Sequence, residues 1–116
     1  MNSEFVYINE VGPRDGLQNQ KIILSSRIRL DLINHLIDAK LPGIEVASFV
    51  SPKAVPAMEG ANKIIQGLVD TKGCEISVLV PNMKGFEMAS EAGAEIISVV
   101  PSATETMNQK NINMGL

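Results

Sequence analysis

Residues 10–19 read Glu10-Val11-Gly12-Pro13-Arg14-Asp15-Gly16-Leu17-Gln18-Asn19, and they say more about the architecture than any other segment. This stretch follows an apolar segment, and together they predict a first strand over residues 6–11 that ends in a turn. The turn sets a guanidinium beside a carboxylate. Neighbouring side chains share one site only if the turn is tight, which its glycines and proline favour. An α/β enzyme carries catalytic and metal-binding groups on such a turn, at the C-terminal end of a strand.

Beyond this turn the chain alternates helix and strand patterns with short connections. Helices are predicted over residues 25–40, 61–69 and 85–92, and further strands over residues 44–49, 76–80 and 95–100. A long loop is predicted over residues 50–60, and another over residues 102–116. Ser25 and Ser26 are candidate N-caps of the first helix, which Pro42 and Gly43 should end.

The first helix has an apolar face at helical spacing. Ile28, Leu32, Leu36 and Ala39 define that face, with Ile33 and Ile37 beside it. We expect these residues to be buried, and we expect the charged residues of the helix, Arg29 among them, to face solvent.

This order of elements predicts the α/β class with parallel strands and right-handed crossovers. A doubly wound sheet and a barrel share the order. A nucleotide-binding sheet has a Gly-rich turn after its first strand, and the Pro and charged pair of residues 12–16 are unlike that turn. We therefore predict a partial (β/α)8 TIM barrel, about its first four strands, because a whole barrel takes roughly 250 residues. Residues 1–116 are expected to be the N-terminal part of one barrel domain, incomplete at the C-terminus.

Composition narrows the partners. Hydrophobic residues make up 45% of the 116 residues, charged residues 20%, and the net charge is -3. This balance is that of a globular protein and offers no basic surface for nucleic acid. No apolar run is long enough to span a membrane, and no signal or transit peptide is evident, so we expect no membrane partner and a cytoplasmic location.

The predicted strand ends place polar residues where a barrel has its active site. The first strand end carries Arg14, Asp15 and Gln18, and the second carries Glu45 and Ser48. The third and fourth carry Asn82 and Lys84, then Ser102, Thr104 and Glu105.

Asp15 suits a hard divalent cation such as Mg2+ or Mn2+, or it is a turn aspartate bonded to its own backbone. Arg14 suits stabilisation of an enolate or carboxylate, or it forms a surface ion pair. Glu45 lies within an apolar strand, so its carboxylate needs a partner, which Arg14 could supply, or a raised pKa. Glu10 poses the same question, and we expect it to form a structural ion pair.

The single His and the single Cys offer little chemistry. His35 falls in the middle of the first helix, outside the barrel, and is not expected to bind metal. Cys74 lies at a helix-to-strand turn, where we expect a passive thiol rather than a catalytic one.

Four stretches in order resemble the 3-hydroxy-3-methylglutaryl-CoA lyase family of metal-dependent barrel enzymes. They are residues 10–19, 44–53 and 81–87, and Ser102-Ala103-Thr104-Glu105 leading to Lys110-Asn111-Ile112-Asn113. The resemblance implies cleavage of 3-hydroxy-3-methylglutaryl-CoA to acetyl-CoA and acetoacetate with a divalent metal, Mg2+ or Mn2+. It implies that Asp15 binds the metal, that Arg14 stabilises the enolate, and that Glu45 is a catalytic acidic residue. Gln18 and Ser48 would lie close to the substrate, with Arg14 also contacting it, and the complete protein is expected to be a homo-oligomer.

The resemblance also has gaps. The family's His-x-His pair, a further Asn ligand and a reactive Cys in a Gly-rich loop have no counterpart in these residues, and Gln20 replaces a common Glu. We therefore expect residues 1–116 to be inactive alone. Two alternatives stay open: a lyase or synthase of the same superfamily acting on a related acyl-CoA or 2-oxo acid, and a non-catalytic half barrel that dimerises.

Overall fold

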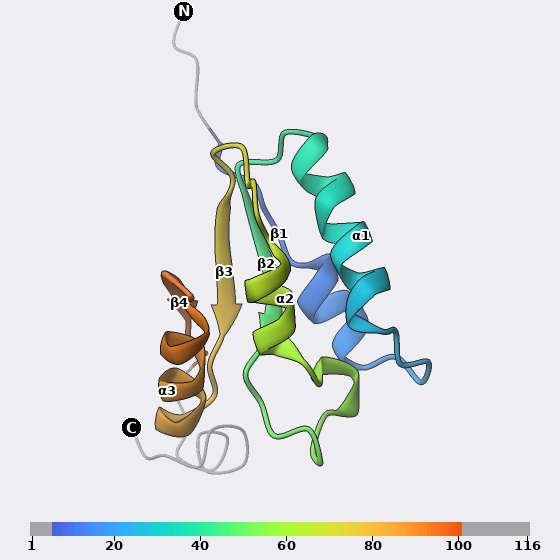
Figure 1. The fold of residues 1–116 in the computed structure, drawn as a ribbon, viewed down its shortest axis with the longest axis vertical. Coiled ribbons are helices and arrows are strands. Elements are labelled where there is room, and N and C mark those ends of the chain that lie inside the picture. Colours follow the sequence, from blue (N-terminus) through green and yellow to red (C-terminus); the bar gives the residue numbers. More distant parts are fainter. Residues whose placement is uncertain (1–5, 101–116) are drawn as a thin grey trace, which may run out of the picture.

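The computed structural model describes residues 6–100, which form one parallel sheet with helices packed on it (Figure 1). The strands are β1 (Asn9–Glu10), β2 (Gly43–Ser48), β3 (Glu75–Leu79) and β4 (Ile96–Ser98), and they neighbour one another in that order. The helices are α1 (Ser26–Asp38), α2 (Ala61–Gly67) and α3 (Met83–Ala92), with single helical turns η1 (Gly12–Gly16) and η2 (Pro56–Met58). The predicted alternation of strands and helices is confirmed.

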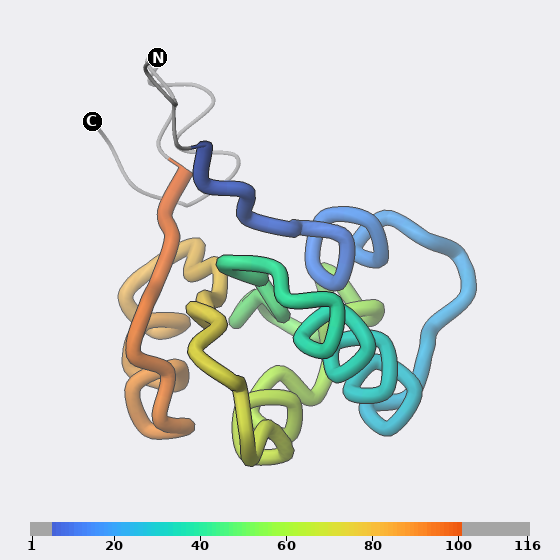
Figure 2. The backbone as a smooth tube through the Cα atoms, turned by 90° about the horizontal axis from the view of Figure 1, so that it is seen from above, coloured from blue at the N-terminus to red at the C-terminus, as the bar shows by residue number. Residues whose placement is uncertain are grey.

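The strand order separates the two architectures that the sequence allowed. In a doubly wound sheet the order reverses at a switch point and helices cover both faces. Here the order is sequential, and α1, α2 and α3 pack one beside the next. Figure 2, which looks along the strands, shows α1 and α2 side by side on one side of β2. Sequential parallel strands with helices on one side are the arrangement of a barrel wall.

Helix ends follow the expected capping chemistry, with one exception. The Ser25 hydroxyl accepts the Ile28 N–H at 3.3 Å, which confirms Ser25 as the N-cap of α1. Gly93, at φ +95°, ends α3 in the left-handed conformation. At the end of α1 it is Lys40, at φ +64°, that adopts this conformation, so the helix stops at Asp38, before the predicted Pro-Gly stop.

The first strand is shorter than predicted. Only Asn9 and Glu10 pair with β2, opposite Gly43 and Ile44. Residues 6–8 lie outside this ladder, and Val6 and Ile8 stay 71% and 55% exposed. Residues 6–8 are apolar, as expected of a strand, but they form no strand pairing within residues 6–100.

The buried face of α1 differs from the predicted one. Arg29, Ile33 and Ile37 are its buried residues, whereas Ile28 is 52% and Leu32 36% exposed. The stripe is rotated by about one residue because α1 meets β2 and α2 through positions 29, 33 and 37. Arg29, predicted to face solvent, is 1% exposed and packs inside the protein.

The core lies between the helices and the outer face of the sheet. β2 is buried along its whole length. Its apolar residues pack with Val78 of β3 and with Val80, which directly follows β3. The register shifts between Glu45 and Ala47, because Glu45 pairs with Ser77 and Ala47 with the next residue, Val78. This irregularity at Val46 has the form of a β-bulge, a feature found next to active sites, where it redirects a side chain.

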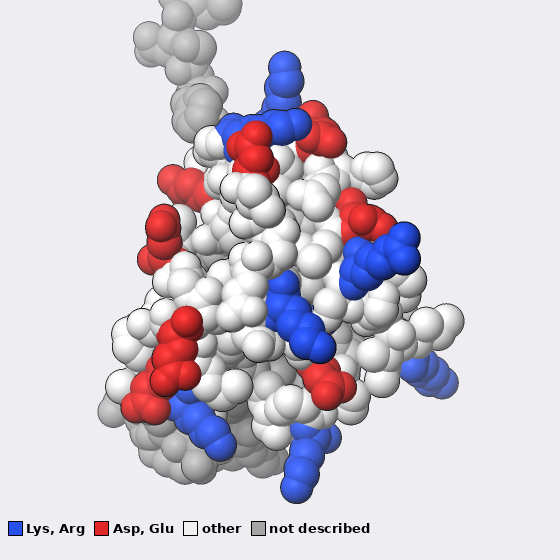
Figure 3. All heavy atoms as spheres, in the orientation of Figure 1, with Lys and Arg blue, Asp and Glu red and all other residues white. Residues whose placement is uncertain are grey.

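Charges are mixed on the surface that carries α1 and α2. Figure 3 shows Lys and Arg interspersed with Asp and Glu on this face, with no extended patch of either sign. No helix within residues 6–100 has the length and apolar character of a membrane span.

Candidate active site

The polar groups predicted from the sequence meet where β1 and β2 end. In Figure 1 the strands run toward the end of the molecule that also carries the loop of residues 50–60. η1 follows β1 directly and packs against β2. The N–H groups of Arg14 and Asp15 both donate to the Val11 carbonyl oxygen, at 3.1 and 2.7 Å, and close the turn. The turn is tight, as expected, and it directs two adjacent side chains to one place.

Pro13 holds the backbone of this turn. It is buried, and its ring fixes the backbone at the first turn of η1. A Cβ at position 12 would lie 2.7 Å from Oε1 of Glu10, the mobile end of a side chain that would have to move aside. Gly16 has open space where a Cβ would be. Neither glycine is therefore needed for a close approach of backbone atoms.

Arg14 is the hub of the site. Its Nε donates to Oε1 of Glu45, and its Nη1 lies 3.2 Å from Oδ1 of Asp15 and 3.4 Å from Oε1 of Gln18. Arg14 and Asp15 come from η1, Gln18 is the second residue after it and Glu45 lies in β2, and the four are brought together as predicted. The Arg14–Glu45 ion pair confirms that Arg14 is the partner of the strand carboxylate.

The two carboxylates around Arg14 have different surroundings. The Glu45 side chain is 7% exposed and the Asp15 side chain is 62% exposed. A buried carboxylate needs a compensating charge and hydrogen bond, and Arg14, itself 16% exposed, supplies both. Asp15 needs no such support, because water reaches most of its side chain. The cluster thus offers one fixed, shielded carboxylate and one accessible carboxylate beside a guanidinium.

Ser48 lies in β2 beyond Glu45 and is 1% exposed. Within residues 6–100 no hydrogen bond joins it to the Arg14 cluster. It lines a separate hollow of about 280 Å³ together with Phe49, Met58 and Gly60. The structure therefore places Ser48 near the same end of the sheet but outside the ion-pair cluster.

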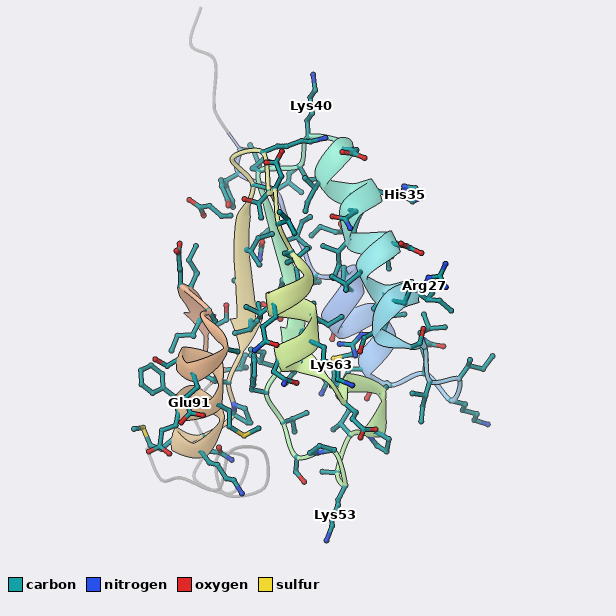
Figure 4. All side chains as sticks on the ribbon, viewed as in Figure 1. Arg27, His35, Lys40, Lys53, Lys63 and Glu91 are labelled. Atoms are coloured by element: carbon teal, nitrogen blue, oxygen red, sulfur yellow. The ribbon has the colours of Figure 1, made fainter. Side chains whose placement is uncertain are left out.

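Several other candidates have structural roles or lie elsewhere. Asn82 caps α3, since its Oδ1 accepts the Gly85 N–H at 2.8 Å. His35 is exposed and points away from α1 (Figure 4). Glu10 forms no ion pair within residues 6–100, which corrects the expectation of a structural pair. Its carboxylate instead lies over Gly12, where the missing Cβ leaves room for it. The predicted residues Ser102, Thr104 and Glu105, and the segment 110–113, lie outside the described part of the chain.

Cys74 is at the opposite end of the sheet, just before β3. It is 8% exposed, and burial, followed by the nearby charge of Glu75, raises the pKa of its thiol. It borders a hollow of about 360 Å³ with Glu75 and Gly93 at the N-terminal strand ends. A buried thiol with a raised pKa is a poor nucleophile, as expected for a passive cysteine.

The cluster has one accessible carboxylate, which is fewer oxygen ligands than a divalent cation needs. Hard divalent cations take six or more oxygen ligands. Asp15 offers one accessible carboxylate, whereas Glu45 already accepts from Arg14. In residues 6–100 no group of three or more His, Cys, Asp or Glu side chains could hold a metal ion. The donor chemistry fits Asp15 as one ligand of a site that other residues complete.

Sequence reasoning missed two polar residues that the fold buries. Ser77 is opposite Glu45 in the β2–β3 register and is 6% exposed. Arg29 is buried under the loop that follows β2. The spacing of Arg29, Ile33 and Ile37 at four-residue steps was the one signal that could have identified the Arg29 face.

Comparison with known proteins identifies the family of this chain. The sequence model of the HMGL-like family matches residues 5–116. The mitochondrial hydroxymethylglutaryl-CoA lyase of Rattus norvegicus is 47% identical over 96% of this chain and 34% of that protein. The cytoplasmic 3-hydroxy-3-methylglutaryl-CoA lyase of Homo sapiens is 46% identical over 97% of this chain and 30% of that protein.

Solved structures agree with these relatives. An HMG-CoA lyase from Acinetobacter baumannii, in complex with coenzyme A and 3-methylmalate, matches with a TM-score of 0.89 at 35% identity. The match covers 99% of this chain and 38% of that one. The HMG-CoA lyase of Brucella melitensis matches with a TM-score of 0.87 at 43% identity, over 97% of this chain and 40% of that one. The chain thus spans about a third of the length of the curated relatives it matches. With the family model matching nearly its whole length, the chain belongs to the HMGL-like family.

Proposed function

We propose that this chain supplies the first part of a carbon–carbon lyase that cleaves 3-hydroxy-3-methylglutaryl-CoA to acetyl-CoA and acetoacetate. The observation that carries the proposal is the cluster in which Arg14 contacts Glu45, Asp15 and Gln18 at the C-terminal strand ends. Relatives named as this lyase, at 44 to 47% identity, support the substrate. Residues 1–116 would be the N-terminal part of a single barrel domain.

The chemistry is a retro-aldol cleavage. A base removes the proton from the tertiary hydroxyl, whose oxygen becomes the new ketone of acetoacetate. The carbon–carbon bond breaks, and its electron pair moves onto the thioester to give the enolate of acetyl-CoA. A proton then returns to that carbon. Negative charge thus develops on the thioester oxygen, and a fixed cationic donor at that oxygen lowers the barrier.

Arg14 is the residue suited to that oxygen. Glu45 holds its Nε and Asp15 and Gln18 lie at its Nη1, so the guanidinium plane is fixed before substrate arrives, and Nη2, which has no hydrogen bond within residues 6–100, remains to donate. Glu45 would act as a catalytic acidic residue in addition to orienting Arg14. Gln18, in reach of the same Nη1, and Ser48, in the adjoining hollow, would contact the substrate.

A divalent cation, Mg2+ or Mn2+, is proposed at Asp15. When bound, such an ion would align the hydroxyl and carboxylate oxygens of the substrate and favour loss of the hydroxyl proton. The exposed Asp15 carboxylate would hold it, next to the positive charge of Arg14. The other ligands would come from outside residues 6–100.

A second candidate substrate is a related acyl-CoA. One similar lyase was solved in complex with coenzyme A and 3-methylmalate, a branched hydroxy diacid, and this complex is the reason to test other acyl groups. Cleavage rates of the complete gene product with 3-hydroxy-3-methylglutaryl-CoA and with other 3-hydroxyacyl-CoA thioesters separate the two. A kcat/KM at least about tenfold higher for 3-hydroxy-3-methylglutaryl-CoA supports the proposal. A higher kcat/KM for another thioester would identify that thioester as the substrate instead. If none of the thioesters is cleaved, lyase function is refuted.

Assembly and location follow from the same assignment. We propose that the complete protein is a homo-oligomer, for which its mass in solution is the test. Similar lyases are named cytoplasmic in Homo sapiens and mitochondrial in Rattus norvegicus. We propose the cytoplasm, and imaging of the tagged complete protein in its own cells decides between the two compartments.

A further inference from the structure

Among residues 6–100, Arg29 is the one buried charged residue that the proposed chemistry does not use. It is 1% exposed, on the face of α1 that also buries Ile33 and Ile37. Its Nη1 donates to the backbone carbonyl oxygen of Glu59 at 2.7 Å. Its Nε and Nη2 have no hydrogen-bond partner within residues 6–100, and no carboxylate there pairs with it. Burial lowers the pKa of this guanidinium, which records the cost of holding the charge there.

Such a residue weakens the fold rather than strengthening it. A buried cation without a counter-charge, with two unsatisfied donors, costs more than an apolar side chain of similar size. Stability therefore does not explain an arginine at this place. Its one satisfied donor points to what it does: it joins α1 to the loop of residues 50–60.

That loop depends on contacts from outside itself. Within residues 6–100, the backbone hydrogen bonds of residues 50–59 join loop residues to one another, from Ala54 to Ser51 and from Glu59 to Pro56, and only the Gly60 carbonyl oxygen accepts from α2, at Lys63 and Ile64. Ala57 and Met58 are buried and provide apolar contact. The hydrogen bond from Arg29 to the Glu59 carbonyl oxygen lies beside these two residues. It is the hydrogen bond that joins this loop to α1 within the described residues.

The loop forms a wall of two hollows at the end of the sheet that carries the Arg14 cluster. One hollow, of about 260 Å³, lies between Gln18, Lys21 and loop residues 54–57. The other, of about 280 Å³, lies between Ser48 and loop residues 58–60. Gln18 lines the first hollow and Ser48 lines the second, and both residues are proposed to contact the substrate. The position of the loop therefore sets the shape of both hollows.

We propose that Arg29 is a positioning residue that holds the loop of residues 50–60 against α1 and thereby shapes the substrate hollows beside Gln18 and Ser48. The proposal rests on the proposed function in taking these hollows to receive the acyl-CoA. Arg29 touches no reacting group, so its loss should weaken substrate binding much more than the chemical step.

The test compares Arg29→Met with Arg27→Met in the complete gene product. Arg27 is exposed on the same helix and points away from it (Figure 4), so its variant controls for loss of a charge from α1. Arg29→Lys keeps a donor and should recover part of the effect. If Arg29→Met does not fold, Arg29→Gln, which keeps a shorter donor, takes its place.

Two measurements decide the matter. Hydrogen exchange of amides in residues 51–59 should be at least about fivefold faster in Arg29→Met than in Arg27→Met, with β2 and β3 unchanged. KM for the acyl-CoA substrate should rise about three- to tenfold, with kcat within about twofold. Equal exchange in the two variants overturns the anchoring, and a fall in kcat at unchanged KM overturns the positioning role. If the wild type cleaves no substrate, the proposed function fails, while the exchange measurement still decides whether Arg29 holds the loop.

Discussion

At the residue scale, one guanidinium serves two carboxylates that differ in their access to water. Arg14 contacts Glu45, whose side chain is 7% exposed, and Asp15, whose side chain is 62% exposed. Water screens the contact with Asp15 more than the contact with Glu45. The two ion pairs should therefore contribute differently to the free energy of unfolding. The buried pair fixes Arg14, and the exposed carboxylate stays available for a ligand.

The two carboxylates therefore make a matched pair of variants. Glu45→Gln removes the buried charge and should lower the free energy of unfolding by about 2 kcal/mol, since Arg14 keeps only its screened partner. Asp15→Asn should lower it by less than about 1 kcal/mol. Urea unfolding of the complete gene product measures both. Equal losses would show that burial does not distinguish the two contacts.

Tyr7 gives a second test at this scale. Its hydroxyl donates to Oε2 of Glu75 at 2.7 Å, and this bond, with the charge of Glu75, raises the pKa of Tyr7 to about 12. An unfolded tyrosine titrates at about 10, so the bond supports the fold fully below pH ~10 and is lost as the pH rises through the folded pKa. The phenolate absorbance of the wild type minus that of Tyr7→Phe should show the raised midpoint.

The cause of that shift is tested with Glu75→Gln. This variant should bring the Tyr7 midpoint back toward its ordinary value, because the charge and the charged acceptor are gone. Glu87→Gln, which changes an exposed carboxylate on α3, should leave the midpoint unchanged. A midpoint that ignores the loss of Glu75 would contradict the assignment.

At the element scale, α3 approaches β2 so closely that one of its residues must be glycine. A Cβ on Gly85 would lie 2.6 Å from the backbone oxygen of Phe49, which cannot move as a flexible side chain can. Helix propensity alone favours Ala over Gly by about 1 kcal/mol. Sterics should reverse that sign and make Gly85→Ala less stable by about 2 kcal/mol.

The control for this prediction is Gly16→Ala, because nothing lies within 4 Å of a Cβ built there. Its free energy of unfolding should change by no more than about 0.5 kcal/mol. Thermal or urea unfolding measures both variants. If Gly85→Ala is as stable as the wild type, α3 does not pack on the end of β2 as the structure shows.

The sequence predicted elements better than it predicted faces. Ser25 and Gly93 stand at the ends of their helices because capping depends on local backbone chemistry. The buried face of α1 depends on which neighbours it meets, and these are far away in sequence. Arg29 was therefore placed in solvent, and the irregularity at Val46 was not foreseen, since register is a property of two strands.

The candidate site was predictable to a similar extent. Arg14, Asp15 and Gln18 lie within five residues, so the turn alone brings them together. The partnership of Arg14 with Glu45 follows from parallel pairing of β1 with β2, which the alternation of elements implied. Ser77 was missed because the register of β3 against β2, which sets Ser77 opposite Glu45, cannot be read from either strand alone.

At the scale of the whole molecule, the described residues leave apolar side chains open at both sheet edges. Val6 and Ile8 precede β1, and Val99 and Val100 follow β4, all between 55% and 71% exposed. Open edges and uncovered apolar surface favour association with another chain. The 116-residue chain by itself should therefore show a mass above 12.5 kDa by light scattering after size exclusion.

Whether the isolated chain aggregates or forms a defined dimer distinguishes a partial barrel from a self-contained half barrel. Soluble aggregate, with no metal-dependent cleavage of 3-hydroxy-3-methylglutaryl-CoA, agrees with a barrel part whose site other residues complete. A well-folded dimer with cooperative unfolding favours a self-contained half barrel instead. Cleavage by the isolated 116 residues would contradict the conclusion that Asp15 is one ligand among several.

The most direct test of the central claim is the rate of 3-hydroxy-3-methylglutaryl-CoA cleavage by the complete gene product and its Arg14→Gln variant, with Mg2+ or Mn2+ present. Glutamine keeps a polar side chain but removes the charge that should stabilise the thioester oxygen. We predict that the wild type releases acetyl-CoA and acetoacetate, and that the variant loses about 100-fold or more in kcat while remaining folded. A folded wild type without cleavage, or a variant within about tenfold of it, would contradict the account.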